Sequence, residues 1–212
     1  MRRKKKALHR NYSFINVHPI AGALGAEIKG VNISRPLKRE VVLEIRQAFL
    51  DHLVIFFHNQ ELTPQELFTF SRQFGLPMEY PQLKGLPECP MITEVIKLES
   101  EKLNFGGVWH SDTTYLEHPP MGSMLYAVNI PPYGGDTLFA NQYLAYETLS
   151  EGLKKTLGDL VGIFTSTKLE VSKTRDNRLS DSGEKLKVMC ASHPVVRTHQ
   201  ETGHKALCEY RT

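Results

Sequence analysis

Cysteine is scarce in this chain, and its few cysteines are widely spaced. The 212 residues contain three, Cys89, Cys190 and Cys208. Because the number is odd and no CxxC pair occurs, the sequence argues against a disulfide framework and against a cysteine zinc site. The pattern is typical of a reducing compartment, so we expect a cytoplasmic protein.

Long apolar runs and a strong charge imbalance are also missing. No stretch approaches the ~20 apolar residues of a membrane helix, and no charged segment leads into an apolar signal-peptide core. The formal net charge is only +3. We therefore expect neither a membrane nor a nucleic acid as partner.

Much of the positive charge lies in the first ten residues, MRRKKKALHR. Such a run is compatible with a phosphate-binding arm, a nuclear signal or a transit peptide. It is short, however, and neither an amphipathic helix nor interleaved aromatic residues accompany it. We interpret residues 1–10 as a basic disordered tail.

The remaining composition is close to that of an average globular protein. Hydrophobic residues make up 41% and charged residues 23% of the chain, which allows a sizeable core. The length predicts one domain, which we assign to residues 11–212. Within it, the polar stretch at about 165–187 is interpreted as a lid or surface insertion.

Short predicted strands alternate with a few helices along the chain. The clearest helix begins with Thr63 as N-cap and Pro64 at its first position, and Gly75 is expected to end it. Further helices are predicted at 38–52 and 143–158. Strands are predicted within 12–33 and at 53–59, 91–98, 122–130, from 136, at 193–199 and after 200. This order favours an α+β chain, mainly β, built on a sandwich or barrel.

The tripeptide His110-Ser111-Asp112 is the first candidate for chemistry. On a strand, residues i and i+2 point to the same side, so an imidazole and a carboxylate would meet at one point. A further histidine from a distant strand would complete a face of two histidines and one carboxylate, which suits non-haem Fe(II). His-x-Asp is common by chance, however, and a surface histidine is the alternative interpretation.

A longer pattern surrounds this tripeptide. Residues 106–141, GGVWHSDTTYLEHPPMGSMLYAVNIPPYGGDTLFAN, combine a WHxD core, the pair Pro119-Pro120 and a GGDT turn ending at Thr137. The segment resembles the Fe(II)- and 2-oxoglutarate-dependent dioxygenases of the taurine dioxygenase family, which includes the dichlorophenoxyacetate dioxygenases. Flanking segments extend the resemblance to roughly residues 14–207.

The resemblance implies both a fold and a function. The fold would be a double-stranded β-helix, a jelly-roll core with flanking helices. His110 and Asp112 would be iron ligands, and Thr137 would hydrogen-bond a carboxylate of 2-oxoglutarate, although an ordinary turn threonine is the alternative. The expected partners are Fe(II), 2-oxoglutarate as co-substrate, oxygen, and a small organic acid such as a sulfonate, an alkyl sulfate or an aryloxyalkanoate.

One departure from the family concerns the substrate. Where taurine-specific members carry a His and a Tyr, this chain has Tyr80 and Leu83, and Gly106 replaces an expected Asn. Taurine itself is therefore disfavoured, and a more apolar pocket is expected. Tyr80 is a candidate substrate contact, with a packed loop tyrosine as the alternative.

A second departure lies at the C-terminus. The family places its second iron histidine and its 2-oxoglutarate arginine beyond the residue at which this sequence ends, Thr212. His193, His199, His204 and Arg197 are the nearest substitutes, but the matching family residues lie outside the iron site. The fold is thus expected to be incomplete at the C-terminus, with exposed edges that favour aggregation or a homo-oligomer.

Two alternatives to an active dioxygenase remain. The first is a catalytically inactive, truncated remnant that binds a metal or a partner at most. The second is a zinc-dependent hydrolase that uses His110 and Asp112, which nothing in the flanking sequence favours.

Overall fold

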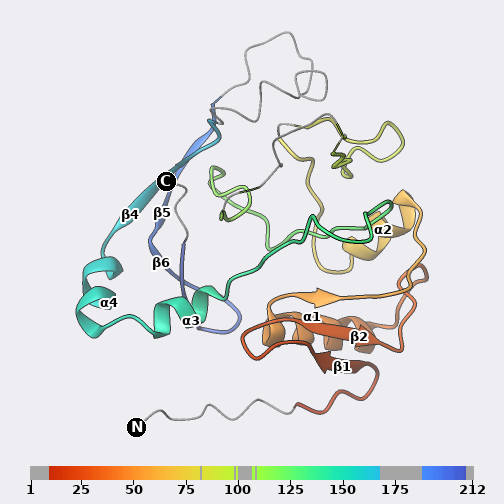
Figure 1. The fold of residues 1–212 in the computed structure, drawn as a ribbon, viewed down its shortest axis with the longest axis horizontal. Helices are drawn as coiled ribbons and strands as arrows, with labels where there is room; N and C mark the ends of the chain where they lie inside the picture. Colours follow the sequence, from red (N-terminus) through yellow and green to blue (C-terminus); the bar gives the residue numbers. More distant parts are fainter. Residues whose placement is uncertain are drawn as a thin grey trace. The chain divides into compact units, whose positions relative to one another are not determined.

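The described part of the chain forms two compact units in a computed structural model (Figure 1). It comprises residues 10–81, 83–97, 99, 107, 109–167 and 188–208. One unit is Met1–Leu76 with Tyr133–Asn141, and the other is Pro77–Pro132 with Gln142–Thr212. The predicted tail, except its last residue, and most of the predicted lid lie outside the described residues. The single domain over 11–212 stays a prediction.

The first unit contains a three-stranded sheet. Strand β1 (Asn16–Pro19) pairs antiparallel with β2 (Ala26–Lys29), and β2 pairs parallel with β3 (Ile55–Phe56). Gly25, just before β2, has a φ of 96°, a conformation that favours glycine, and its N–H donates to His52 O at 2.8 Å. The prediction of strands within residues 12–33 is confirmed, and β1 and β2 form a hairpin.

Strand β3 is much shorter than the strand predicted at 53–59. Leu53 and Asn59 both have positive φ values, 68° and 54°. Left-handed residues cannot continue an extended ladder. Only Ile55 and Phe56 therefore pair with β2.

Two helices flank this sheet in the sequence, α1 (Arg39–His52) and α2 (Pro64–Ser71). Thr63 caps α2 as predicted: its Oγ1 accepts from Glu66 N at 3.2 Å, while Glu66 accepts from Thr63 N at 2.8 Å. The prediction that Gly75 ends α2 was wrong. After Ser71 the chain tightens into turns, and Phe74 N donates to Ser71 O at 3.0 Å.

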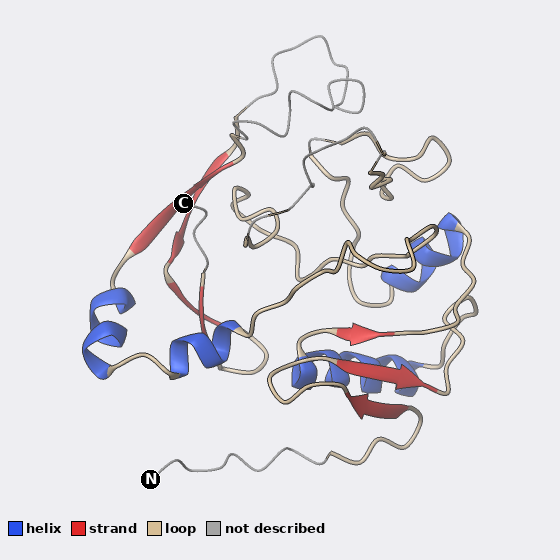
Figure 2. Ribbon diagram, viewed as in Figure 1, coloured by secondary structure: helices blue, strands red, loops and turns tan. Residues whose placement is uncertain are grey.

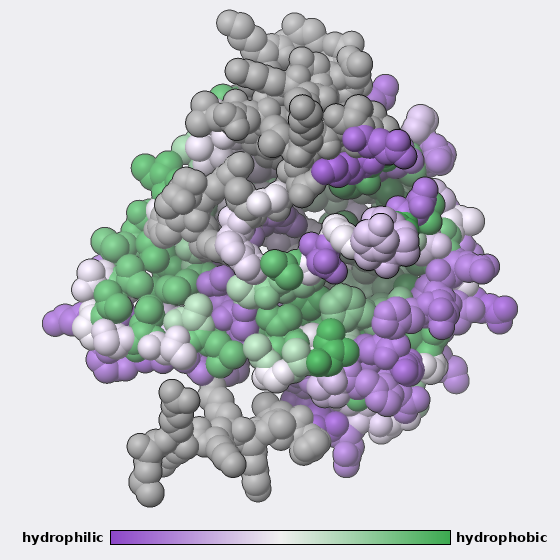
Figure 3. Space-filling view, viewed as in Figure 1, coloured by the Kyte–Doolittle hydropathy of each residue, from purple (hydrophilic) through white to green (hydrophobic). Residues whose placement is uncertain are grey.

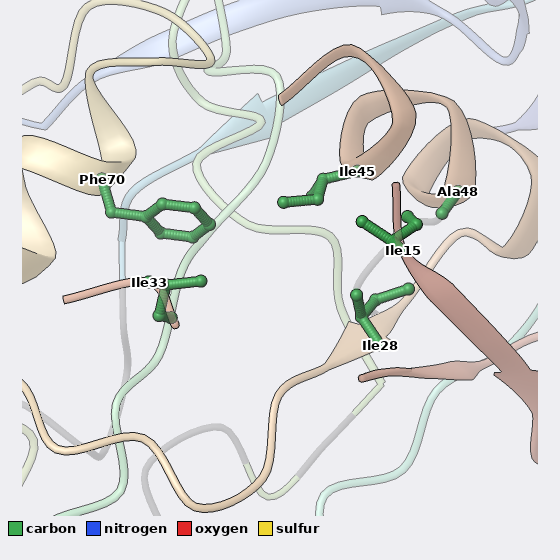
Figure 4. Close-up of a cluster of buried hydrophobic side chains, with 6 residues drawn as sticks. All are labelled: Ile15, Ile28, Ile33, Ile45, Ala48 and Phe70. Atoms are coloured by element: carbon green, nitrogen blue, oxygen red, sulfur yellow. The ribbon is translucent and has the colours of Figure 1, made fainter. Parts of the chain in front are cut away.

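The core of the first unit lies between α1, α2 and the strands (Figure 4). Ile45 and Ala48 are three residues apart on α1, so they lie on one helix face, and both are fully buried. Phe70 packs edge-on against the ring of Phe74, with centroids 5.2 Å apart. The cluster consists of Ile15, Ile28, Ile33, Ile45, Ala48 and Phe70.

The second unit begins its regular structure with two short helices. The helix predicted at 143–158 is divided into α3 (Gln142–Glu147) and α4 (Glu151–Gly158). Ser150 separates them because its backbone is extended, with φ −65° and ψ 155°, and its Oγ accepts from Leu153 N at 3.2 Å. A serine in this geometry is an N-cap and therefore starts a new helix.

Two small antiparallel sheets follow. Strand β4 (Val161–Thr165) pairs with β5 (Cys190–Pro194), and β6 (Val196–Thr198) pairs with β7 (Lys205–Leu207). The strand predicted at 193–199 is thus divided between two sheets. Val195 lies at the division, donating to Leu160 O and accepting from Cys208 N.

Three predicted strands are not formed in the described residues: residues 91–97, 122–130 and the segment from 136 are drawn as loop (Figure 2). A strand exists only where a neighbouring backbone pairs with it, and none of these segments takes part in a described ladder.

Apolar residues also reach the surface on the visible face (Figure 3). The described residues are α+β, and the three small sheets among them do not by themselves establish a jelly roll. No helix among the described residues is long and apolar enough to span a membrane.

Candidate metal centre

The structure brings His110 and Asp112 together in the second unit. His110 Nε2 lies 3.1 Å from Asp112 Oδ1, and the two side chains are 41% and 55% exposed. The prediction that the two residues lie on a strand was wrong. They lie instead on an irregular segment that enters a turn at Asp112, and this turn places both groups on one side.

The distance between these two atoms fits a pair of metal ligands. Nitrogen and carboxylate ligands bind transition metals at about 2.1 Å. If two ligand atoms each lie at this distance from the ion and the two bonds form a right angle, the ligand atoms are about 3.0 Å apart. An imidazole and a carboxylate are also a donor set that suits Fe(II). His110 and Asp112 can therefore occupy adjacent positions around one ion.

Ser123 orients the carboxylate. Its hydroxyl donates to Asp112 Oδ2 at 2.9 Å, which leaves Oδ1 facing His110 Nε2. Such hydrogen bonds from outside the ligand set fix the direction of a ligating carboxylate. The sequence offered no signal for this contact, because the two residues are 11 positions apart in a loop without periodicity.

The turn after Asp112 is held by a histidine from a different part of the chain. His193 is 6% exposed, and its Nε2 lies 2.9 Å from the carbonyl oxygens of both Thr114 and Leu116. Since both partners are acceptors, Nε2 carries a hydrogen and donates it. His193 is therefore unable to bind a metal through this nitrogen.

His199 and His204 lie at the turn between β6 and β7. Their rings contact Tyr143 of α3, with centroid distances of 6.3 and 5.2 Å. Within the part of the chain that the structure describes, no group of three or more His, Cys, Asp or Glu side chains is placed to hold a metal. No described residue therefore supplies the third ligand, the second histidine of the predicted set of two histidines and one carboxylate.

Two tyrosines lie near Asp112. Burial raises the pKa of Tyr80 and of Tyr115, and the charge of Asp112 raises both further. Tyr115 is 8% exposed, and its hydroxyl interacts with that of Tyr80 without reaching hydrogen-bond geometry. It has no hydrogen-bond partner among the described residues. Sequence reasoning missed Tyr115, whereas Tyr80 was a candidate substrate contact; Gly106 lies outside the described residues.

Thr137 lies in the first unit, on the exposed segment Tyr133–Asn141. The preceding Gly134 and Gly135 have φ values of 80° and 74°, a backbone conformation that favours glycine. Asn141 ties the end of this segment to its unit by donating to Ala23 O at 2.6 Å. Thr137 and the His110–Asp112 pair thus belong to different units.

The chain is similar to known proteins over most of its length. Residues 16–212 match the family described as "Taurine catabolism dioxygenase TauD, TfdA family". The chain belongs to this family.

Several individual enzymes and structures are similar to this chain. An alkylsulfatase of Acinetobacter baylyi is 34% identical over 91% of this chain and 62% of its own length. An alpha-ketoglutarate-dependent sulfate ester dioxygenase of Pseudomonas putida is 32% identical over 91% of this chain and 65% of its own. A taurine dioxygenase structure from Burkholderia xenovorans superimposes with a TM-score of 0.72 at 35% identity, covering 92% of this chain and 64% of that one. The chain thus spans less than two thirds of the length of these relatives.

Proposed function

We propose that this chain carries part of the active site of an Fe(II)- and 2-oxoglutarate-dependent dioxygenase that hydroxylates a small organic acid. The observation that carries the proposal is the distance of 3.1 Å between His110 Nε2 and Asp112 Oδ1, which fits adjacent ligands of one ion. Family membership supports the choice of chemistry. We further propose that the chain forms part of a jelly roll, the architecture of TauD-type enzymes.

His110 and Asp112 would hold the iron, and Ser123 would keep Asp112 Oδ1 directed at it. Thr137 would donate its hydroxyl hydrogen to a carboxylate of 2-oxoglutarate. When bound, the iron supplies the reaction of oxygen with 2-oxoglutarate and substrate, which yields succinate, carbon dioxide and a hydroxylated carbon. The exposure of the His110–Asp112 pair leaves room for the co-substrate and oxygen beside the two protein ligands.

A sulfate ester is the substrate class that we favour, ahead of sulfonates and aryloxyalkanoates. The names of two relatives, alkylsulfatase and sulfate ester dioxygenase, support this order. Tyr80 would bind the anionic head of the substrate, because a phenol with a raised pKa stays protonated and donates a hydrogen bond. Hydroxylation of the carbon next to the ester oxygen would release sulfate and an aldehyde. Taurine is disfavoured by the residues Tyr80, Leu83 and Gly106.

The test is the binding of Fe(II) and 2-oxoglutarate by the purified chain without oxygen. Chelated 2-oxoglutarate gives a weak visible charge-transfer band on Fe(II), and we expect this band in the wild type. Asp112→Ala should abolish it, because the carboxylate ligand is lost. Asp159→Ala, which removes an exposed carboxylate from the end of α4, is the matched control and should retain it.

Oxygen and a medium-chain alkyl sulfate are then added, and succinate and sulfate are measured. Equal amounts of the two products support a sulfate ester dioxygenase. Succinate without sulfate supports the dioxygenase but excludes this substrate class. If neither the band nor succinate is found, the inactive alternative is correct and the proposed activity is wrong for this chain.

A further inference from the structure

The residues directly after Asp112 form a turn that we call the site turn, Thr113–Leu116. Leu116 N donates to Thr113 O at 2.9 Å and closes the turn. The direction of the Asp112 carboxylate depends on this turn, because the backbone leaves Asp112 through it.

The site turn has an unfavourable conformation at its first residue. Thr113 has a φ of 52°, and a β-branched residue is rarely found in the left-handed region. Its side chain is 6% exposed, and Thr113 Oγ1 has no hydrogen-bond partner within the described residues. Local sequence preference therefore opposes this turn, and a conformation of this kind persists only where the surroundings impose it.

His193 supplies a constraint from outside the turn. It lies on β5, where it is the register partner of Gly162 on β4, and its ring packs against Phe164 at 5.6 Å between centroids. From this fixed position Nε2–H reaches the carbonyl oxygens of both Thr114 and Leu116, each at 2.9 Å. One N–H shared by two carbonyls holds two points of the same turn at once.

We propose that His193 is a positioning residue for the metal pair: it holds the site turn so that Asp112 presents Oδ1 to His110 Nε2. The part of this inference that concerns a metal rests on the proposed function. Its structural part, the dependence of the site turn on one N–H of His193, does not.

The test compares His193→Gln with His193→Leu. Glutamine can place an amide N–H near the position of Nε2, whereas leucine fills similar space without a donor. We expect the Leu116 amide to exchange its hydrogen at least about 10-fold faster in His193→Leu than in the wild type, because the turn opens more often. His193→Gln should restore most of the protection. If Leu116 exchanges at the wild-type rate in His193→Leu, the proposal is wrong.

Metal affinity provides the second measurement. Trp109 is the only tryptophan of the chain; it is 52% exposed and adjacent to His110, so its fluorescence reports on the site. Titration with Mn²⁺ alone should show dissociation constants about 10- to 100-fold higher in His193→Leu, the range for partners that orient a ligand. An unchanged affinity at equal folded fraction would overturn the positioning role.

Phe164→Leu is the matched control, since it loosens the packing around the same ring without removing the N–H of His193. It should lower the melting temperature but leave Leu116 exchange and Mn²⁺ affinity near wild-type values. If it changes both as much as His193→Leu does, the effect is general loosening and the proposal fails. Should His193→Leu not fold, His193→Asn replaces it, because its shorter amide does not reach the carbonyls.

The two proposals fail in different ways. If the wild type does not bind Mn²⁺, the proposed function is wrong, but Leu116 exchange still decides whether His193 holds the site turn. If the wild type binds Mn²⁺ and His193→Leu changes neither measurement, the positioning role is wrong and the proposed function stands.

Discussion

Apolar side chains differ sharply in burial between the core of the first unit and the segment Met121–Ile130 of the second. The residues of the core cluster are at most 7% exposed. In the segment, Leu125, Val128 and Ile130 are 77%, 87% and 72% exposed. The sequence predicted strands in both regions, yet only the first region formed them.

The position of the pairing partners explains this difference. In the first unit, β1 and β2 are joined by a short loop, and β3 follows α1 directly, so every partner lies nearby in the sequence. No described segment pairs with Met121–Ile130. An apolar strand pattern therefore shows which face a segment buries, but its burial depends on a partner that the pattern does not identify.

Truncating a core residue should give the largest effect. Ile45→Ala should lower the free energy of unfolding by about 2–5 kcal/mol, because Ile45 is fully buried and a cavity would remain. Ile130→Ala, at a side chain 72% exposed, should change it by less than about 0.5 kcal/mol. Urea denaturation followed by circular dichroism measures both. Equal losses would show that the exposed segment is buried in solution and would remove the contrast.

Removing the Ser123 hydroxyl should affect the site rather than the fold. Ser123→Ala should weaken Mn²⁺ binding by about 10- to 100-fold, since Asp112 Oδ2 loses its donor and the carboxylate can rotate. Titration followed by Trp109 fluorescence measures this change. Ser150→Ala, which removes the N-cap of α4 in the same unit, is the control and should lower stability but not affinity. Equal affinities in the two variants would refute an orienting role for Ser123.

The glycine pair Gly134-Gly135 tests whether an exposed segment still has a strict backbone requirement. Gly134→Ala should cost about 1–2 kcal/mol, because Gly134 has a φ of 80° and a Cβ disfavours that conformation. Space is not the cause, since a Cβ at Gly134 would meet no atom within 4 Å. Gly22, which has equal space and no positive φ, is the control and should tolerate alanine. Equal unfolding midpoints for the two variants in urea would show that the backbone at Gly134 relaxes freely.

The smallest predicted effect is a pH dependence at the start of α2. Hydrogen bonds from the backbone and then the side chain of Thr63 lower the pKa of Glu66 below its usual 4.5. A pKa that is lower in the folded state gives stabilisation that is present above the unfolded-state value and lost as the pH falls through the folded-state value. Wild type should therefore be slightly more stable than Glu66→Gln at neutral pH, and the difference should vanish in acid. A difference that persists in urea denaturation at low pH would contradict this cause.

Much of the first unit could be predicted because its determinants are local. Thr63, Pro64 and Glu66 lie within four positions and specify the start of α2 by themselves. The end of α2 could not be predicted in the same way, since turns after Ser71 replaced the expected stop at Gly75. The positive φ values of Leu53 and Asn59, which shorten β3, also have no signature in an apolar run.

For the candidate site, the sequence alone predicted His110 and Asp112 as ligands, from their spacing and from the WHxD and GGDT pattern around them. It also identified the family to which the chain belongs. Only the tertiary structure decided which groups hold the pair. Ser123 lies 11 positions from Asp112, and His193 lies 79 and 77 positions from the two carbonyls that it binds. Contacts over such separations depend on the path of the backbone through the fold, and no local pattern of residue types encodes that path.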